Sequence, residues 1–490
     1  MLLLSYLILF LYSLSIVVIF VYGLAQLNLL INYLKSKKLI DNSQKFNFTN
    51  PTEIPLVTIQ LPIFNEKYVV ERLLNAIAKL EYPKEKLEIQ VLDDSNDDST
   101  SITKRIVADL SQLGLDIKYI NRSNRSGFKA GALKEGLVIA KGEFIAIFDA
   151  DFVPQKEWLL QTIPYFKDKT IGVVQTRWGH LNRNYSVLTK IQAFALDAHF
   201  TLEQVGRNSK SHFINFNGTA GVWRKQCIID AGNWESDTLT EDLDLSYRAQ
   251  LKKWKFKYLE HIVTPAELPA IISAARSQQF RWNKGGAENL RKMFFRIIKA
   301  KTMTPKNKIH GILHLMNSSL FLAIFIMALL SVPVLYIKSF YVQLETFFDA
   351  MLFFIITTII FFIYYWIAFK NTQGNDFFKF TKSFLTFFII AMGFSFNNTI
   401  AVLEGLWGKK SEFVRTPKLN IEDRKGKWKD NKYISKKISK KVLAEGILSG
   451  YFLFGIYSSY SLNDYSLLLL HLMLFFGFGF VFVKSITDTK

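Results

Sequence analysis

The first 34 residues contain no Lys, Arg, Asp or Glu, and this uncharged run constrains the fold more than any other feature of the chain. About 20 apolar residues suffice to cross the hydrocarbon core of a bilayer. A cleaved secretory signal is the alternative, but the run lacks a basic start and is too long for the apolar core of such a signal. The sequence therefore predicts a transmembrane helix over residues 1–34.

Uncharged apolar windows return in the second half of the chain. They are Leu320–Ile337, Ala350–Phe369, Ser383–Leu403, Gly446–Asn463 and Tyr465–Val483. Because Lys and Arg gather in loops that stay in the cytoplasm, the basic residues just after the first helix and in segment 406–441 predict the orientation. We expect a cytosolic central domain and an N-terminus outside, in an inner, plasma or Golgi-type membrane.

Residues 310 and 406 are both expected on the cytosolic side, so an even number of crossings must separate them. Three apolar windows lie between them, and Ser383–Leu403, which contains Asn397 and Asn398 and is followed by Glu404, has the weakest claim to span. We expect this segment to lie in the membrane interface. The prediction is five crossings, one before the central domain and four after it.

The net charge of +20 raises nucleic-acid binding as an alternative. The basic residues cluster beside the membrane windows, so orientation in the bilayer and contact with anionic lipid explain them better. We therefore expect the lipid bilayer, and no nucleic acid, as a partner. The single cysteine, Cys227, excludes a disulfide framework and a cysteine metal cluster.

Residues 56–265 alternate short β-type runs with helical stretches, which predicts βαβ units and a mostly parallel α/β sheet. The expected strands are Leu56–Leu61, Leu87–Leu92, Asp116–Ile120, Glu143–Phe148 and Ile171–Thr176. Sheets of this kind bind ligands beyond the carboxyl ends of their strands. Several acidic residues of the domain follow those ends.

Asp93 and Asp94 follow the second expected strand and could accept hydrogen bonds from a nucleotide, with turn and capping roles as the alternative. Asp149 and Asp151 follow the fourth strand, where two carboxylates can hold one divalent cation, Mg²⁺ or Mn²⁺. Lys129 lies in a glycine-flanked turn that opens a helix and could meet phosphate oxygens.

Two further motifs lie later in the chain. Thr240-Glu241-Asp242 precedes a helical stretch, and helix capping is the alternative to a catalytic role. In Gln278-Gln279-Phe280-Arg281-Trp282, adjacent Arg and Trp do not share a helix face, so a simple amphipathic helix does not explain the motif. Interfacial anchoring is the alternative there.

Taken in order, Asp94, Asp149-x-Asp151, Thr240-Glu241-Asp242 and Gln278-x-x-Arg281-Trp282 form the D, DxD, TED, QxxRW series. The series resembles processive glycosyltransferase family 2, the cellulose-synthase and hyaluronan-synthase type. The runs at 90–95, 128–136, 147–152 and 216–224 resemble the plant cellulose-synthase-like A and C enzymes, which make β-1,4-mannan or glucomannan and the glucan backbone of xyloglucan. The resemblance implies a GT-A (Rossmann-like) domain.

The resemblance also implies an activity: inverting transfer of a hexose from a nucleotide sugar, of the UDP-glucose or GDP-mannose type, to a growing β-linked glycan that crosses the membrane. Asp242 would be the catalytic base, and Asp149 and Asp151 would bind the metal. The donor would contact Asp93, Asp94, Lys129, Asp149, Gln278 and Arg281, and the acceptor Phe216, Asn217, Gly218, Glu241 and Trp282.

Phe413–Lys418 resembles the FxVTxK gating loop of the same family, in which Thr416 and Lys418 would contact the donor phosphates. Arg415 departs from the usual Val. A nonprocessive, ceramide-type lipid glycosyltransferase and an inactive membrane subunit are the alternative functions. Accessory export subunits are further candidate partners.

These inferences divide the chain into seven parts. They are a transmembrane helix (1–34), a linker (35–55), the glycosyltransferase domain (56–270), interfacial helices with QxxRW (271–309), two transmembrane helices plus one interface helix (310–405), a basic cytosolic segment (406–441) and two transmembrane helices (442–490).

Overall fold

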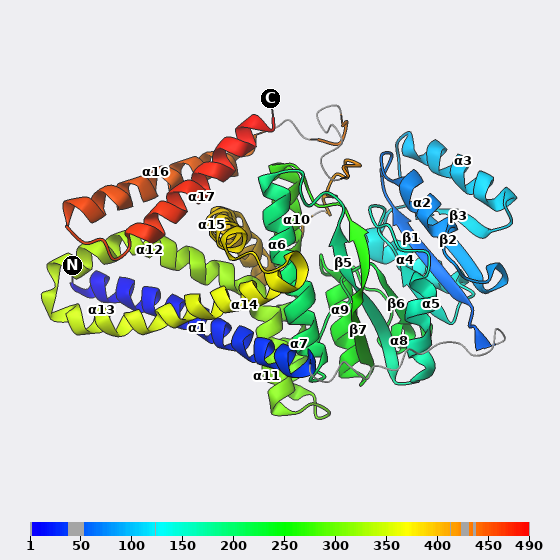
Figure 1. Ribbon diagram of the computed structural model, residues 1–490, viewed down its shortest axis with the longest axis horizontal. Helices are drawn as coiled ribbons and strands as arrows, with labels where there is room; N and C mark the ends of the chain where they lie inside the picture. Colours follow the sequence, from blue (N-terminus) through cyan, green and yellow to red (C-terminus); the bar gives the residue numbers. More distant parts are fainter. Residues whose placement is uncertain are drawn as a thin grey trace.

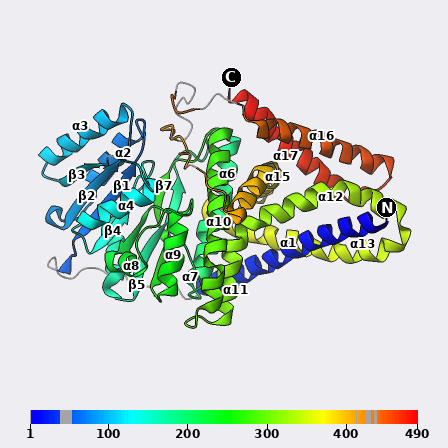
Figure 2. The same cartoon turned by 180° about the vertical axis from the view of Figure 1, so that it is seen from behind.

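The computed structural model describes residues 2–37, 53–122, 124–411, 413–422, 431–434 and 438–489. Most of the expected linker 35–55 and part of the basic segment 406–441 lie outside these residues. An α/β domain occupies one side of the molecule and a bundle of long helices the other (Figure 1). The reverse view shows the same division (Figure 2).

The α/β domain is built on a seven-stranded sheet in the order β3-β2-β1-β4-β6-β5-β7. The strands are β1 Val57–Ile63, β2 Leu87–Asp93, β3 Asp116–Asn121, β4 Phe144–Ile147, β5 Ile171–His180, β6 Gly221–Arg224 and β7 Lys255–Ala266. The first four are parallel neighbours, β6 runs antiparallel to both β4 and β5, and β5 pairs in parallel with β7. The sheet is therefore mixed, with one antiparallel strand in an otherwise parallel arrangement.

The central strands alternate Val, Ile and Leu with polar residues such as Gln60, Glu88 and Gln90, and both kinds are buried. Six of the seven residues of β1 and all seven of β2 are buried, as expected for parallel strands covered on both faces. All five expected strands are present. Two strands are not among the expected ones: β6 has only four residues, and charged residues interrupt the apolar run of β7.

Helices cover both faces of the sheet and form two separate cores. On one face lie α2 Val70–Ala78, α3 Ser99–Gln112 and α5 Trp158–Thr162, and on the other α4 Phe128–Ile139, α8 Lys225–Asp230 and α9 Glu241–Leu251. Each fully buried Leu, Ile or Val in these cores contributes about 1.5–3 kcal/mol.

The second core continues into the membrane part. After α6 (Val187–Ala198), a π-helix (His199–Glu203) and α7 (Gln204–Asn208) pack against α1 (Leu2–Lys37). Leu30 and Tyr33 of α1 belong to the same apolar cluster as the sheet residues. Gly206 permits the contact, since a Cβ atom there would lie 2.5 Å from the carbonyl oxygen of Leu29. The α/β domain and the first membrane helix are therefore one packed unit.

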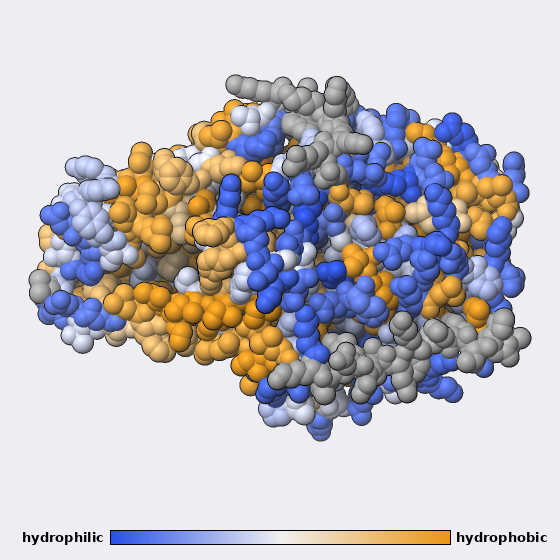
Figure 3. Space-filling view, viewed as in Figure 1, coloured by the Kyte–Doolittle hydropathy of each residue, from blue (hydrophilic) through white to orange (hydrophobic). Residues whose placement is uncertain are grey.

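Among the described residues, six segments are long and apolar enough to span a bilayer. Their helices are α1, α11 Pro305–Leu315 with α12 Leu320–Phe340, α13 Glu345–Met351 with α14 Ile356–Gln373, α15 Phe377–Trp407, α16 Lys440–Ser461 and α17 Leu468–Thr487. Apolar side chains gather on the surface of this half (Figure 3). The protein is an integral membrane protein, as the sequence predicts.

Helix α15 is the segment that we expect in the interface. By length and composition it qualifies as a span like the others. It is seen nearly end-on in Figure 1, whereas α1, α12 and α16 run across the view. A helix lying in the membrane plane would have this orientation. The five crossings, the orientation of the chain and the boundaries of its seven parts stay predictions.

Candidate active site

One cavity opens at the carboxyl ends of β1, β2 and β4, where the sequence predicts a ligand site. Nearly all the predicted site residues line it. They are Asp94, Lys129, Asp149, Asp151, Asn217, Gly218, Glu241, Asp242, Gln278, Arg281, Trp282, Thr416 and Lys418. Residues more than 300 positions apart in the sequence therefore meet at one place.

Lys129 occupies the corner of the cavity where three motifs meet. Its Nζ atom lies 2.6 Å from Asp149 Oδ1 and donates to the carbonyl oxygen of Gly218 at 2.9 Å. Burial disfavours the charged amine, but the charges of Asp149 and Glu241 outweigh it and raise the pKa of Lys129. The ammonium is therefore fixed as a cation beside the DxD pair.

Gly218 has a left-handed backbone, with φ +79°, and lies between Lys129 and Asp242. A Cβ atom at this position would come within 3.1 Å of Asp242 Oδ2 and 3.5 Å of Lys129 Nζ. Only glycine satisfies both the backbone conformation and the limited space. This close approach places the Asp242 carboxylate beside the Lys129–Asp149 pair.

Asp242 lies in the first turn of α9. Burial, and next the charge of Glu241, raise the pKa of Asp242 to about 7, against the opposing effect of Lys129. The backbone N–H of Leu243 donates to Asp242 Oδ1 at 2.9 Å, which leaves the second oxygen on the side of Gly218. A carboxyl group with this pKa can accept a proton near neutral pH.

Asp151 is buried more deeply than Asp149, with side chains exposed by 2% and 37% respectively. Its Oδ2 atom lies 2.7 Å from Lys418 Nζ, whereas Oδ1 has no hydrogen-bond partner among the described residues. A buried carboxylate oxygen without a donor is costly, and a hard cation would satisfy it. The two carboxylates therefore suit a divalent cation.

Helix α10 (Ile272–Lys299) brings the QxxRW motif to the cavity. It packs closely on the TED motif, because Gly285 leaves room for Thr240, whose Oγ1 atom would lie 2.4 Å from a Cβ atom on that glycine. Asn289 donates to the same hydroxyl at 2.9 Å. Thr240 precedes α9 without capping it through its side chain. Trp282 is 37% exposed at the rim.

The segment Phe413–Lys418 lies against the cavity. Arg415 forms two hydrogen bonds of 2.9 Å with the carboxylate of Glu66, and Arg281 donates to Thr416 Oγ1 at 3.0 Å. Phe413 stacks on Phe128 with a centroid distance of 5.8 Å. At the position of Val in the FxVTxK pattern, this chain has an Arg whose ion pair with Glu66 links the segment to the turn after β1.

Two predicted contact residues do not face the cavity, and these predictions need correction. The carboxylate of Asp93 is fully buried and accepts from the Ser95 N–H at 2.9 Å and from Tyr119 Oη at 3.0 Å. The ring of Phe216 is also fully buried, in the core beside Trp223. The alternation of side chains along β2 turns Asp93 into the domain, and Phe216 packs in the core. Both residues therefore support the cavity from inside the domain without lining it.

Three functional residues in or next to the cavity were not predicted from the sequence. Glu66 and Glu267 line the cavity, and burial raises the pKa of both, to about 7 for Glu66. Arg122 holds Asp94 through both carboxylate oxygens, with Nε 2.8 Å from Oδ1. Glu66 and Glu267 follow β1 and β7. The alternating pattern of Lys255–Ala266 predicts a strand, and such a strand would place Glu267 at its carboxyl end.

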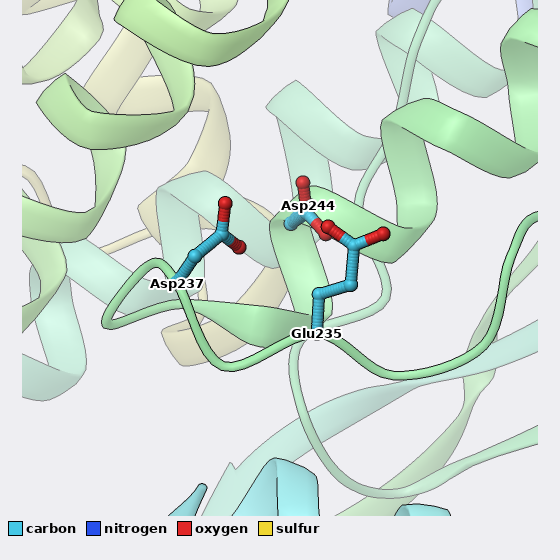
Figure 4. Close-up of side chains that lie close together, drawn as sticks. All are labelled: Glu235, Asp237 and Asp244. Atoms are coloured by element: carbon cyan, nitrogen blue, oxygen red, sulfur yellow. The ribbon is translucent and has the colours of Figure 1, made fainter.

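A second acidic group lies outside the cavity. Glu235, Asp237 and Asp244 have carboxylate oxygens within 4.8 Å of one another, close enough to hold a metal ion (Figure 4). Lys292 Nζ already lies 2.7, 2.7 and 2.8 Å from these three carboxylates. A Lys ammonium occupies the place that a cation would take, so this group is an ion-pair network.

The fold defines an α/β domain of the GT-A class that packs against the helices of an integral membrane protein. Residues 55–285 match the family model described as "Glycosyltransferase like family 2". This part of the chain resembles a glycosyltransferase family 2 domain, and the predicted GT-A fold class is confirmed.

Curated relatives agree over the same region. Glucomannan 4-beta-mannosyltransferase 1 of Oryza sativa subsp. japonica is 43% identical over 263 residues, 53% of this chain and 50% of the relative. Glucomannan 4-beta-mannosyltransferase 9 of Arabidopsis thaliana is 42% identical over 263 residues, 53% and 49% of the two chains. The resemblance to the cellulose-synthase-like A enzymes is confirmed. The chain spans about half the length of these relatives.

A solved structure among those that match resembles most of the chain. It is a mannosyltransferase, PcManGT from Pyrobaculum calidifontis, in complex with GDP-Man and Mn²⁺. The TM-score is 0.54 at 19% identity, and the match covers 82% of this chain and 100% of the other. At this level of identity the likeness concerns the fold, and it extends beyond the family 2 domain.

Proposed function

We propose that this protein is a membrane-bound hexosyltransferase that moves a sugar from a nucleotide-sugar donor to a growing β-linked glycan. One observation carries the proposal: four residues from separate elements of the fold line the same cavity. They are Asp149 and Asp151 after β4, Asp242 on α9 and Trp282 on α10. A capping role for the TED motif would not require that meeting, nor would anchoring of Trp282 in the interface.

Inverting transfer needs a base on the acceptor hydroxyl. Asp242 suits this role, since its raised pKa favours proton acceptance and one oxygen is free of the Leu243 N–H. Trp282 at the rim offers an aromatic face to the acceptor sugar. Positioning of this kind can contribute about 7–11 kcal/mol to the rate.

The departing nucleoside diphosphate needs positive charge. Lys129, Arg281 and Lys418 line the cavity and can contact phosphate oxygens. Asp149 and Asp151 would hold a divalent cation, which when bound supplies further neutralisation of the leaving group. Lys129 and Lys418 contact these same carboxylates, so the residues that would hold the cation and the cations that would meet the phosphates form one charged cluster.

The nucleotide itself would lie over Asp94. Arg122 fixes the orientation of this carboxylate and also donates to the carbonyl oxygen of Phe128 at 3.0 Å. Asp93 supports the same turn from inside the domain. Asp94 would therefore contact the nucleotide, whereas Asp93 stabilises the turn that carries Asp94.

We propose GDP-mannose as the first donor to test and UDP-glucose as its comparison. The curated relatives are named as glucomannan 4-beta-mannosyltransferases, and the solved mannosyltransferase binds GDP-Man and Mn²⁺. Export of the product through the membrane part is proposed from the segment Phe413–Lys418, which resembles the gating loop of the polymer-exporting branch.

Purified full-length protein in detergent should incorporate label from one of these donors into polymer when Mg²⁺ or Mn²⁺ is present. Linkage analysis and digestion by β-mannanase or cellulase then identify the product. A single sugar on an extractable lipid would support the nonprocessive alternative. Absence of incorporation from every donor, with folded protein, would overturn the proposal.

A further inference from the structure

A second cavity adjoins the candidate active site and lies between α10, α15, α16 and α17. Leu239 and Arg281 line both cavities. The walls of the second include Lys441 in the first turn of α16 and Ser485 in the last turn of α17, and both helices are candidate membrane spans. The cavity therefore lies where the α/β domain meets the ends of membrane helices.

The charges that line this cavity do not balance. Arg276 is paired with the buried Glu445 at 2.6 Å, and Asp488 with Lys484 at 2.6 Å. Lys441 has no carboxylate within ion-pair distance among the described residues, and its Nζ atom lies 4.3 Å from the centroid of the Phe280 ring. A partly buried ammonium in this position favours an anionic ligand.

The other polar lining groups suit phosphate oxygens. Hydroxyl-bearing residues also line the cavity, namely Ser273, Ser277, Ser411, Ser439, Ser485 and Thr489. Phe280 is the single aromatic residue among the described lining residues, so the stacking surfaces that a sugar chain would use are few. A phosphate group fits this chemistry better than a neutral glycan does.

An apolar surface leads away from the cavity along α16. Ser439, which lines the cavity, is followed at four-residue intervals by Leu443 and Ile447, so the three share one side of the helix. Leu443 is 65% exposed and Ile447 66% exposed. A polar recess that continues into an exposed apolar helix face matches a lipid, with a charged head and acyl chains.

We propose that this cavity binds the phosphate group of an anionic membrane lipid, with Lys441 as its cation and the acyl chains along Leu443 and Ile447. The site is separate from the proposed sugar transfer and does not depend on it. Arg281 lines both cavities, so its guanidinium group would be attracted electrostatically to the bound phosphate from the side opposite the donor.

The test uses the full chain purified in detergent and native mass spectrometry to count bound lipid. Phosphatidylglycerol is compared with phosphatidylcholine of the same chain length, and inorganic phosphate and glycerol phosphate serve as headgroup probes. The variant Lys441→Gln is matched with Lys440→Gln, which removes the same charge from the exposed neighbour. Arg276 is left unchanged because its loss would strand the buried Glu445.

We expect phosphatidylglycerol to bind the unmodified chain in preference to phosphatidylcholine. Lys441→Gln should weaken that binding about tenfold, the order of one charge-assisted hydrogen bond, while Lys440→Gln leaves it unchanged. Equal binding of the two lipids overturns the proposal and needs no variant, so the test survives a Lys441→Gln chain that does not fold.

Three other results would also decide against it. An equal loss of phosphatidylglycerol binding in Lys440→Gln would show that binding depends on general surface charge and not on Lys441. Free phosphate binding as tightly as the lipid would assign the cavity to a soluble anion. Displacement of the lipid by neutral manno-oligosaccharides would make the cavity part of a glycan path. Sugar transfer is not measured in any of these arms, so failure here is distinct from failure of the proposed function.

Discussion

Two groups of carboxylates in this molecule look alike by composition and differ in what surrounds them. Glu235, Asp237 and Asp244 converge closely, yet Lys292 contacts all three and Arg248 contacts Asp244 as well. In the cavity, Asp149 is 37% exposed, and among the described residues the buried Oδ1 atom of Asp151 has neither a hydrogen bond nor an ion pair, whereas Asp244 Oδ1 is paired with Lys292. Convergence alone therefore does not define a metal site.

The two groups differ in how easily their lysines can be displaced from the carboxylates. Lys292 is held by three carboxylates at once and is largely buried, so its displacement would expose several charges together. Lys129 and Lys418 each contact one of the two DxD aspartates, and an incoming cation with its phosphates would offer both lysines new partners. The first group is suited to stability and the second to exchange of ligands.

The largest effect is expected from Asp242→Asn. Loss of a general base typically costs about 10²–10⁴-fold in rate, and the amide is nearly the same size as the carboxyl group, so folding should be retained. The measurement is incorporation of labelled sugar under saturating donor, with thermal unfolding as the control. Full activity in a folded Asp242→Asn chain would remove Asp242 from the mechanism.

The different roles of the two carboxylate groups are tested by neutralising one group at a time. Asp149→Asn and Asp151→Asn should each lower metal-dependent transfer by about 10²–10³-fold, the scale seen when a group that stabilises the transition state is lost. Asp237→Asn should leave the dependence of transfer on Mg²⁺ or Mn²⁺ concentration unchanged. If Asp237→Asn abolished the metal response instead, the assignment of the two groups would be reversed.

The pH profile should show an acidic limb near the pKa of Asp242, which burial and Glu241 raise to about 7. The base works deprotonated, so activity falls as pH drops through that value, about tenfold for each further pH unit. Glu241→Gln removes the neighbouring negative charge and should move the limb to lower pH. A limb that stays in place in Glu241→Gln would assign it to another group.

The smallest effect on activity is expected from Lys292→Met. This change leaves three carboxylates without their shared cation and should destabilise the fold by about 1–3 kcal/mol, seen as a lower unfolding temperature in detergent. Metal-dependent transfer at low temperature should persist. Stabilisation of the Lys292→Met chain by added Mg²⁺ would indicate that the network can become a metal site once the lysine is gone.

Much of the site could be predicted because its residues follow strand ends. Asp94, Asp149 and Asp151 lie beyond β2 and β4, where parallel strands place their carboxyl ends at one edge. Asp93 could not be separated from Asp94 in this way, because which of two neighbours faces inward depends on the pleat of β2 in its sheet. Glu267 was missed because β7 carries charged residues that hide its apolar alternation.

The local order of residues determined the membrane windows, the βαβ pattern and the motifs, since helix length, strand alternation and charge are properties of short segments. Only the folded chain decided that Arg415 is bonded to Glu66, that Gly218 brings Asp242 to Lys129, and that Lys292 neutralises the Glu235 group. Each of these contacts joins segments whose distance in space is set by how the sheet and helices pack, and packing is a property of the whole molecule.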